Sequence, residues 1–432
     1  MKFDVIDQAI VGVNDDDKST ISIPFDRILA ITQGLVFSVS SEDTPSLDVH
    51  LFNESNLTAE IQKFNISDLP YYIDPRITEV TVINSKTAGK RSGEQIYANI
   101  LRPLLKELGI VHKYISTESK STISAFAESL TPDRGPHTVI LLSGDTSIHE
   151  LINSLQLTSE TRDLIILPIP TGSGNALMTS LSLATPFAAI FSLLRGTVRP
   201  LNAFYAAFPK NSKEVIPPSD EDPDGKIATL TTPDGNTGSQ RIFSLVVVSW
   251  AIHAALVGDS DSPEYRKLGN DRFKIAAKVN LERGTAWHGK LSYLSPSKEG
   301  GECERSTRRV ELDDVEHSYV LTTSISSLEP GFKIAPTAKP LTGNLELVRM
   351  PLLKGDDIMR LLMLAYQNGA HVKEPEVLYT EIDCLYVRVD EEEERMRRWC
   401  VDGRIIIVPQ GSVVEVHRGV ADVRGWRIMI AI

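Results

Sequence analysis

Two neighbouring stretches decide the fold: TVILLSGDTSIHELIN at residues 138–153 and DLIILPIPTGSGNAL at residues 163–177. In each stretch, an apolar run rich in Ile and Leu ends in a short loop that contains glycine, and residues with helical spacing follow. A short continuous apolar run between turn signals is typical of a strand that is buried on both faces, as in a parallel sheet. Both stretches therefore predict a strand, a loop and a helix in succession.

Two further units of the same kind precede this pair. EVTVIN (79–84) predicts a strand before a helix at about 93–108, and IVHKYIST (110–117) predicts a strand before a helix at about 121–130. The helices after the other two strands are expected at about 147–156 and 174–182. Four consecutive strand–helix units predict a parallel α/β domain at about residues 78–200.

The flanking regions are rich in β-type runs. Residues 1–77 alternate such runs with polar turns, and after residue 200 nine further runs predict strands, from NAFYAAF to VVEVHR. The polar stretch 209–240, with scattered Pro and Gly, is expected to be a disordered insertion. The apolar run 243–258 is shorter than the roughly 20 residues of a membrane helix and is interpreted as a buried strand followed by a turn.

Composition excludes several classes of protein. With 432 residues the chain has room for about two to three domains. Apolar residues make up 41% and charged residues 24%, which is ordinary for a globular protein and argues against disorder throughout. The net charge of −12 argues against non-specific nucleic-acid binding. Three cysteines without a CxxC pair argue against a disulfide scaffold or structural zinc, and the absence of a secretory signal predicts a cytoplasmic protein.

The loops after the strands have the character of phosphate-binding loops. Loops that follow parallel strands open at the carboxyl edge of the sheet, where ligands bind. Gly172 and Gly174 would let the backbone approach a ligand, and the next helix N-terminus offers free N–H groups. The loop NSKTAGKRSG (84–93) adds three cations. This chemistry suits a polyphosphate; an ordinary βα turn and a solvated loop are the alternatives, and the chain has no GxxxxGK[ST] string.

Spacing alone leaves the acidic residues open. Asp145 precedes a helix, so it is either a helix cap, which spacing favours, or a base that deprotonates a hydroxyl. The run DSDSPEYRKLGNDRF (259–273) is by default a solvated loop, and so is the acidic run 390–394. His149 and His253 are interpreted as structural, and no metal site on the protein is predicted.

Taken in order, these segments resemble the diacylglycerol kinase catalytic-domain superfamily over about residues 78–418, and among its branches they look most like the sphingosine (long-chain-base) kinases. The matching segments are NSKTAGK, the pair Thr117-Glu118, SGDTSIHELINS, PTGSGNAL, the run 259–273 and Asp402-Gly403-Arg404. Four positions depart from the pattern: Ser85 stands for proline, Thr146 and Ser154 for glycine, and Arg404 for glutamate.

The resemblance implies a role for each matched position. It implies ATP and Mg²⁺ as cofactors, Asp145 as the proton acceptor and Asp259 as the residue that binds the polar head of a lipid. The positions that it places around ATP are Asn84, Ser85, Lys86, Thr117, Ser143, Glu150, Gly172, Ser173, Gly174, Arg266, Arg272, Asp402, Gly403 and Arg404.

The fold that the resemblance implies is α/β plus β. A parallel, NAD-kinase-like nucleotide-binding domain (78–200) is followed by a β-sandwich lipid-binding domain (201–432), which the strands of residues 1–77 join or flank, and the site lies in the cleft between the two domains.

The implied function is an ATP-dependent lipid kinase that phosphorylates a sphingoid base. The alternatives are a diacylglycerol or ceramide kinase, and a catalytically impaired binding protein, which Thr146 and Arg404 favour. A lipid substrate implies peripheral contact with intracellular membranes. The helix predicted at 356–369 either makes that contact or packs its apolar face, with Ile358, Leu361, Leu362 and Ala365, on the sandwich.

Overall fold

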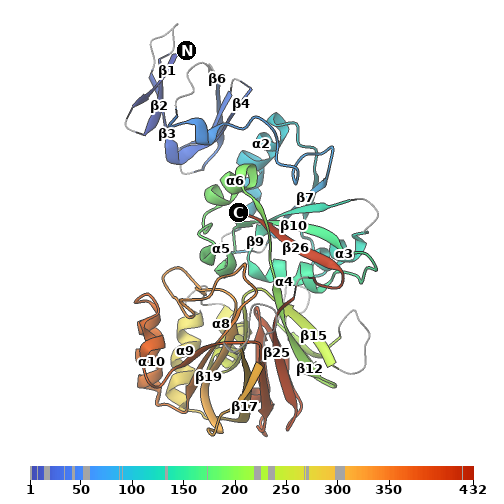
Figure 1. Ribbon diagram of the computed structural model, residues 1–432, viewed down its shortest axis with the longest axis vertical. Coiled ribbons are helices and arrows are strands. Elements are labelled where there is room, and N and C mark those ends of the chain that lie inside the picture. The colour runs from blue at the N-terminus through green and yellow to red at the C-terminus, as the bar shows by residue number, and fades with distance from the viewer. Residues whose placement is uncertain are drawn as a thin grey trace.

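The computed structural model describes residues 2–6, 8–13, 20–33, 35–40, 44–51, 59–86, 88–89, 91–131, 135–172, 174–217, 225–231, 239–266, 268, 272–296, 307–420 and 422–432. They are arranged in three successive parts, with a small β-rich N-terminal part at one end, an α/β part in the middle and a large β-rich part at the other end (Figure 1).

The middle part contains the predicted parallel sheet. Its strands run in the order β11-β26-β10-β9-β7-β8, where β11 is Val198–Pro200 and β26 is Trp426–Ala431, and all neighbours are parallel except β11 with β26. The four predicted strands are β7 (Glu79–Asn84), β8 (Lys113–Ser116), β9 (His137–Ser143) and β10 (Arg162–Pro170). Every residue of β9 is buried, which accounts for its uninterrupted apolar run.

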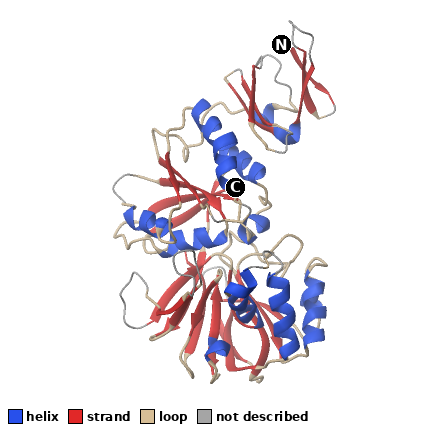
Figure 2. Ribbon diagram, turned by 180° about the vertical axis from the view of Figure 1, so that it is seen from behind, coloured by secondary structure: helices blue, strands red, loops and turns tan. Residues whose placement is uncertain are grey.

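Helices cover both sides of this sheet (Figure 2). They are α1 (Gly93–Ile96), a π-helical turn (Tyr97–Leu101), α2 (Arg102–Glu107), α3 (Thr122–Ser129), α4 (Asp145–Asn153), α5 (Ala176–Ser180) and α6 (Pro186–Arg195). The first four predicted helical regions therefore match. The helix α6 was not predicted, and it begins with a Thr185 cap and Pro186, which is a common start for a helix.

The large β-rich part is one continuous 14-stranded antiparallel sheet that curls on itself. Its strands are β12 (Ala203–Pro209), β13 (Lys213–Ile216), β14 (Lys226–Thr229), β15 (Ser239–Ser244), β16 (Val247–Ala251), β17 (Trp287–Pro296), β18 (Thr307–Glu311), β19 (Glu316–Thr323), β20 (Leu345–Pro351), β21 (Leu378–Ile382), β22 (Cys384–Val389), β23 (Arg398–Val401), β24 (Arg404–Ile407) and β25 (Val413–Val420). All nine predicted runs lie in these strands.

Buried aromatic side chains fill the interior of the curl. The rings of Trp250 and Trp399 stack at 6.1 Å, and Phe208 of β12 meets Trp399 of β23 edge-on at 6.4 Å. The first contact joins the neighbouring strands β16 and β23, whereas the second joins β12 and β23, which lie far apart in the sheet order. The helices α7 (Ile252–Ser260), α8 (Pro263–Arg266), α9 (Arg272–Arg283) and α10 (Gly355–Ala365) lie along one side of the curled sheet (Figure 1).

Three sequence predictions about this part need correction. The stretch 209–240 contains the strands β13 and β14, because β24 offers β13 a free edge that no local pattern reveals; residues 218–224 and 232–238 lie outside the described residues. The run 243–258 contains β16 followed by the helix α7 rather than a turn. The domain predicted at 201–432 also ends earlier, because the C-terminal strand β26 (Trp426–Ala431) belongs to the α/β part, where it pairs in parallel with β10.

The N-terminal strands do not join the large sheet. Two three-stranded antiparallel sheets are formed by β1 (Lys2–Ile6), β2 (Ala9–Val13) and β3 (Thr20–Pro24), and by β4 (Ile28–Thr32), β5 (Leu35–Val39) and β6 (Leu47–Leu51). They dock on α6 instead, where Phe191 meets Phe64 edge-on and Arg195 donates to the backbone carbonyls of Leu29, Lys63 and Phe64. This part therefore lies on the far side of the α/β domain from the large sheet (Figure 1).

The helix α10 packs its apolar face against the protein. Ile358, Leu361 and Ala365 are buried, as the alternative interpretation expected, whereas Met359 and Met363 are exposed on the other side. Among the described residues, no helix has both the length and the apolar character needed to span a membrane.

Candidate active site

The predicted phosphate loops meet at the carboxyl edge of the parallel sheet. The backbone N–H of Lys86 donates to Thr117 Oγ1 at 3.1 Å, which joins the loops after β7 and β8. The backbone N–H of Gly172 donates to the carbonyl of Ser143 at 3.2 Å, which joins the loops after β10 and β9. These contacts bring the four loops together at one edge of the sheet, where the strand–loop–helix order predicts them.

Two glycines let the loops after β9 and β10 cross in contact. A Cβ atom on Gly172 would lie 2.5 Å from Gly144 Cα, and a Cβ atom on Gly144 would lie 2.7 Å from the carbonyl oxygen of Gly174. Gly174 itself has space, since the nearest atom to a Cβ there would be Asp145 Oδ2 at 3.9 Å. Glycine is therefore required at 144 and 172 for packing, but not at 174. Ser173 lies outside the described residues.

Asp145 is the first residue of α4, yet its carboxylate does not cap that helix. It accepts hydrogen bonds from the backbone N–H groups of Ala176 at 2.7 Å and Leu177 at 3.3 Å, which are the first residues of α5. Burial, reinforced by the negative charge of Asp402, raises the pKa of Asp145 to about 7. The carboxyl group is therefore tuned to accept or release a proton near neutral pH.

Asp402 is a buried carboxylate at the turn between β23 and β24. Asp402 and Gly403 both have positive φ, as a two-residue hairpin turn requires. Its carboxylate accepts from Ser244 Oγ and from three successive backbone N–H groups, at Leu245, Val246 and Val247, over 2.7–3.1 Å. Burial favours a higher pKa, but these bonds and the contact with His149 outweigh it, so the pKa of Asp402 stays below its usual value.

His149 and Asn153 of α4 connect the α/β part to the large sheet. His149 Nδ1 lies 3.2 Å from Asp402 Oδ2, and burial lowers the pKa of His149, so the neutral ring donates this bond. Asn153 exchanges two hydrogen bonds of 2.9 Å with the backbone of Phe243 in β15. The interpretation of His149 as structural fits this tie, which holds Asp145 at the junction of the two parts.

Further polar groups at this edge have partners that the sequence did not indicate. Asn84 Nδ2 donates to Glu94 Oε2 at 2.8 Å and to Tyr114 Oη at 3.2 Å, while the buried Asn84 Oδ1 makes no hydrogen bond with any described residue. Glu150 accepts from the backbone N–H and the hydroxyl of Ser124 on α3. Of these partners, only the place of Glu94 in the first turn of the helix predicted at about 93–108 follows from the sequence.

The two substitutions that favoured an impaired site have explanations in the structure. Thr146 lies within the first turn of α4, with a regular helical backbone that does not require glycine. Arg404 forms a two-pronged ion pair with Glu214 of β13, with Nε–Oε1 and Nη2–Oε2 distances of 2.8 and 2.6 Å. Glu214 was missed because it lies in the stretch expected to be disordered.

Asp259 lies near the end of α7, and its carboxylate is held mainly by cations. Arg395 Nη2 donates to it at 2.6 Å, Arg398 Nη1 at 3.1 Å and Asn280 Nδ2 at 3.1 Å. Burial favours a higher pKa, but these partners outweigh it and leave the pKa of Asp259 below its usual value. The predicted head-group carboxylate is thus already paired with positive charge.

The other two arginines of this segment, Arg266 and Arg272, belong to α8 and to the start of α9. Arg272, which begins α9, forms an ion pair with Asp261 at 3.0 Å. Arg266 ends α8, but its side chain lies outside the described part of the structure.

The carboxylates present do not fit a protein-held Mg²⁺ ion. Both oxygens of Asp402 are occupied by hydrogen bonds, and the described residues contain no group of three or more His, Cys, Asp or Glu side chains that could hold a metal ion. Asp145 keeps free lone pairs, but it is a single ligand.

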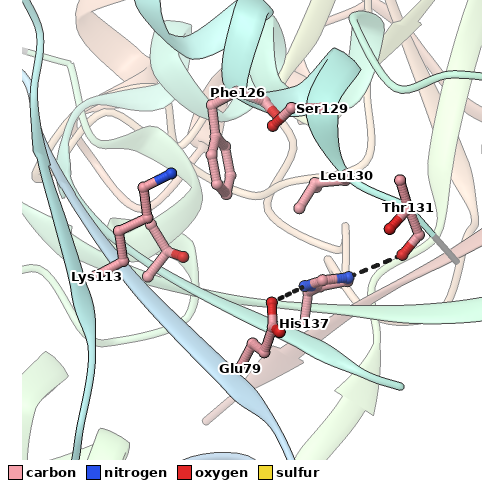
Figure 3. Close-up of a pocket in the computed structure, with 8 residues that line it drawn as sticks. Glu79, Lys113, Phe126, Ser129, Leu130, Thr131 and His137 are labelled. Atoms are coloured by element: carbon pink, nitrogen blue, oxygen red, sulfur yellow. Dashed lines mark hydrogen bonds and ion pairs between the residues drawn. The ribbon is translucent and has the colours of Figure 1, made fainter. Parts of the chain in front are cut away.

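A separate pocket opens at the opposite edge of the sheet (Figure 3). It has a volume of about 250 Å³ and includes Glu79 and His137, the first residues of β7 and β9, together with Lys113 and Phe126. Since Asn84 and Ser143 end the same two strands, this pocket lies at the other end of the sheet from the candidate site.

Comparisons with known proteins agree with the motifs. Residues 79–206 match the family model of the diacylglycerol kinase catalytic domain. Human sphingosine kinase 1 is 22% identical over 382 residues, which cover 80% of this chain and 91% of that protein. Mouse sphingosine kinase 1 is 24% identical over 390 residues, with the same coverage. The resemblance to the diacylglycerol kinase superfamily and to sphingosine kinases is therefore confirmed.

Solved structures agree on the fold. A candidate diacylglycerol kinase from Bacillus anthracis str. Sterne aligns with a TM-score of 0.53 at 14% identity, covering 82% of this chain and 94% of that chain. A second such structure from the same organism aligns with a TM-score of 0.52 at 12% identity, covering 83% and 98%. At these identities the likeness concerns the fold alone: an α/β part with a parallel sheet, and a large antiparallel sheet.

Proposed function

We propose that this protein is an ATP-dependent lipid kinase that transfers the γ-phosphoryl group of ATP to a lipid hydroxyl. The observation that carries the proposal is Asp145, a desolvated carboxylate with a pKa of about 7 at the edge where the phosphate loops meet. A base is most effective when its pKa lies near the working pH. The family model and the sphingosine kinase relatives support the same reaction class.

The proposed reaction transfers the γ-phosphoryl group of ATP to the lipid hydroxyl at this site. The lipid hydroxyl oxygen forms a bond to the γ-phosphorus while the bond from that phosphorus to the bridging oxygen breaks, and ADP leaves. Asp145 accepts the proton of the hydroxyl. The close crossing of the loops at Gly144 and Gly172 shapes the edge near which the phosphates would lie. Mg²⁺ belongs to this proposal only as a companion of the ATP phosphates, since the residues that the structure describes contain no ligand set for it.

The preferred lipid in this proposal is a sphingoid base, because the named relatives are sphingosine kinases. A specific observation favours a second candidate, a neutral lipid such as diacylglycerol or ceramide. Asp259 already accepts hydrogen bonds from Arg395 and Arg398, so a cationic amine would have to displace a guanidinium. A neutral head group makes no such demand.

Several finer expectations belong to the same proposal. They are the kinship of the α/β domain with NAD kinases, a sandwich-like lipid domain, a cytoplasmic location and peripheral contact with intracellular membranes. A lipid with long apolar chains stays in the bilayer, so the kinase must reach it there. The exposed Met359 and Met363 of α10 offer one surface for this contact.

The experiment incubates the purified protein with radiolabelled ATP and vesicles that contain sphingosine, diacylglycerol or ceramide. Label in any of the three lipids supports a lipid kinase, and the most strongly labelled lipid identifies the branch. No label in any lipid, with the protein folded and ATP bound, contradicts the proposal and favours a binding protein.

A further inference from the structure

Arg404 lies close to the base although it belongs to the other part of the molecule. Gly403 precedes it, and a Cβ atom on Gly403 would lie 3.4 Å from the methyl carbon of Thr146, the residue after Asp145. Asp402, one residue further back, contacts His149 of α4. The charge of Arg404 also lowers the pKa of Glu150, against the larger effect of burial. The guanidinium is therefore within electrostatic reach of α4.

The partner of Arg404 is a single carboxylate on a neighbouring strand. Glu214 faces Ile406 in the register between β13 and β24, so it is the diagonal neighbour of Arg404 on the same face. Both side chains keep partial exposure, 29% for Arg404 and 24% for Glu214. Because water still reaches both side chains, another anion can reach the pair as well.

The acidic groups around Asp145 favour a positively charged side chain nearby. Asp145, Asp402 and Glu150 are acidic, and ATP would add a polyphosphate. A guanidinium binds a phosphate through two parallel N–H bonds, in the same geometry in which Arg404 now binds Glu214. A phosphate can therefore replace the carboxylate without a new side-chain arrangement.

We propose that Arg404 is a phosphate-binding residue of the nucleotide site and that Glu214 is its counter-ion in the empty site, which the ATP phosphates displace. The inference rests on the proposed function, since it places ATP at this edge of the sheet. It assigns the charge reversal at 404 a binding role in place of the impairment that the sequence suggested. Glu214 then competes with ATP, so the two partners of one ion pair have opposite effects on ATP affinity.

The experiment measures ATP and adenosine binding by calorimetry to the full chain and its variants. Arg404→Ala is expected to weaken ATP binding about tenfold or more, because charge-assisted hydrogen bonds are lost. Glu214→Gln is expected to strengthen ATP binding by about 1.5- to 5-fold, the strength of an exposed ion pair. Adenosine, which has no phosphates, is expected to bind equally to all variants.

Two further variants separate binding from folding. Arg404→Lys keeps the charge but not the two-pronged geometry, and it is expected to restore part of the ATP affinity. Arg360→Ala removes an arginine of α10 that is similarly paired with Glu374 and Glu376, and it is expected to leave ATP binding unchanged. Thermal unfolding of each variant reports the structural cost of losing the pair.

The outcomes are distinct. Equal weakening of ATP binding by Arg404→Ala and Glu214→Gln, or equal losses for ATP and adenosine, would show that the pair only supports the fold and would overturn the inference. Unchanged ATP affinity in Arg404→Ala would overturn it as well, while leaving the proposed function intact. A wild-type chain that binds no ATP would overturn both.

Discussion

Asp145 and Asp259 are both half-buried aspartates near the end of a helix, and the structure gives them opposite environments. Among the described residues, Asp145 accepts hydrogen bonds from backbone N–H groups alone, and burial raises its pKa to about 7. Asp259 accepts from two arginines and an asparagine, which hold its pKa below the usual value. The first carboxylate can exchange a proton near neutral pH, whereas the second is a permanent anion that anchors α7 to α9 and β23. The partners of a carboxylate, rather than its residue type, decide its role.

The largest effect is expected for the loss of the proposed base, Asp145. Asp145→Asn removes the base but keeps the shape of the side chain, so turnover is expected to fall by about 10²- to 10⁴-fold with the fold intact. Lipid phosphorylation and circular dichroism measure the two parts of this statement. Asp357→Asn, at an exposed acid of α10, is the matched control and is expected to retain full activity. Turnover within about threefold of wild type would reduce Asp145 to a cap of α5.

A second change tests the loops that surround Asp145. Gly172→Ala is expected to weaken ATP binding and to cost about 1–3 kcal/mol of unfolding free energy, because its Cβ would lie 2.5 Å from Gly144 Cα. Gly174→Ala is the matched control, since its Cβ would contact nothing closer than 3.9 Å. Calorimetry with ATP and urea unfolding compare the pair. Equal behaviour of the two variants would contradict the crossing of the loops.

A third change tests whether Asp259 anchors α7 to α9 and β23. Asp259→Asn leaves Arg395 and Arg398 without their carboxylate, so it is expected to lower the unfolding free energy by about 1–3 kcal/mol at neutral pH. Asp261→Asn, at a neighbouring ion pair with Arg272, is the milder comparison. Urea unfolding measures the loss. If stability is unchanged while the KM for sphingosine alone rises, Asp259 is a head-group ligand and the anchor role is wrong.

The smallest effect is a difference in pH dependence. The raised pKa of Asp145 makes its contribution to stability complete below its unfolded value, near 3.8, and that contribution is lost as pH rises through about 7. The lowered pKa of Asp259 has the opposite sign: its contribution is present above the unfolded value and is lost as pH falls through the folded pKa.

Urea unfolding between about pH 4 and pH 8 separates these two contributions. The stability of Asp145→Asn relative to wild type is expected to improve as pH rises over this range. The deficit of Asp259→Asn is expected to persist through the same range and to shrink only below it. The same pH trend in both variants would contradict the difference between the two environments.

Much of the α/β part could be predicted from local pattern. The strand β7 was predicted with the bounds that the structure has, and β9 and β10 begin one residue before the apolar stretches quoted from residues 138 and 163. Buried parallel strands can be recognised in a sequence because both of their faces are apolar. The strands β13 and β14 were missed because they are only four residues long, lie within a polar stretch and depend for their pairing on β24, almost 200 residues away.

The sequence by itself determined which residues stand at the ends of the parallel strands, because a strand–loop–helix order places its loops at one edge of the sheet. It also determined the resemblance, through the order of the motifs. Only the tertiary structure decided what each charged group contacts: backbone N–H groups for Asp145, arginines for Asp259 and Glu214 for Arg404. The physical reason is that burial and charge act through space at a few ångströms, whereas the partners of these groups lie from about 30 to almost 200 residues away along the chain.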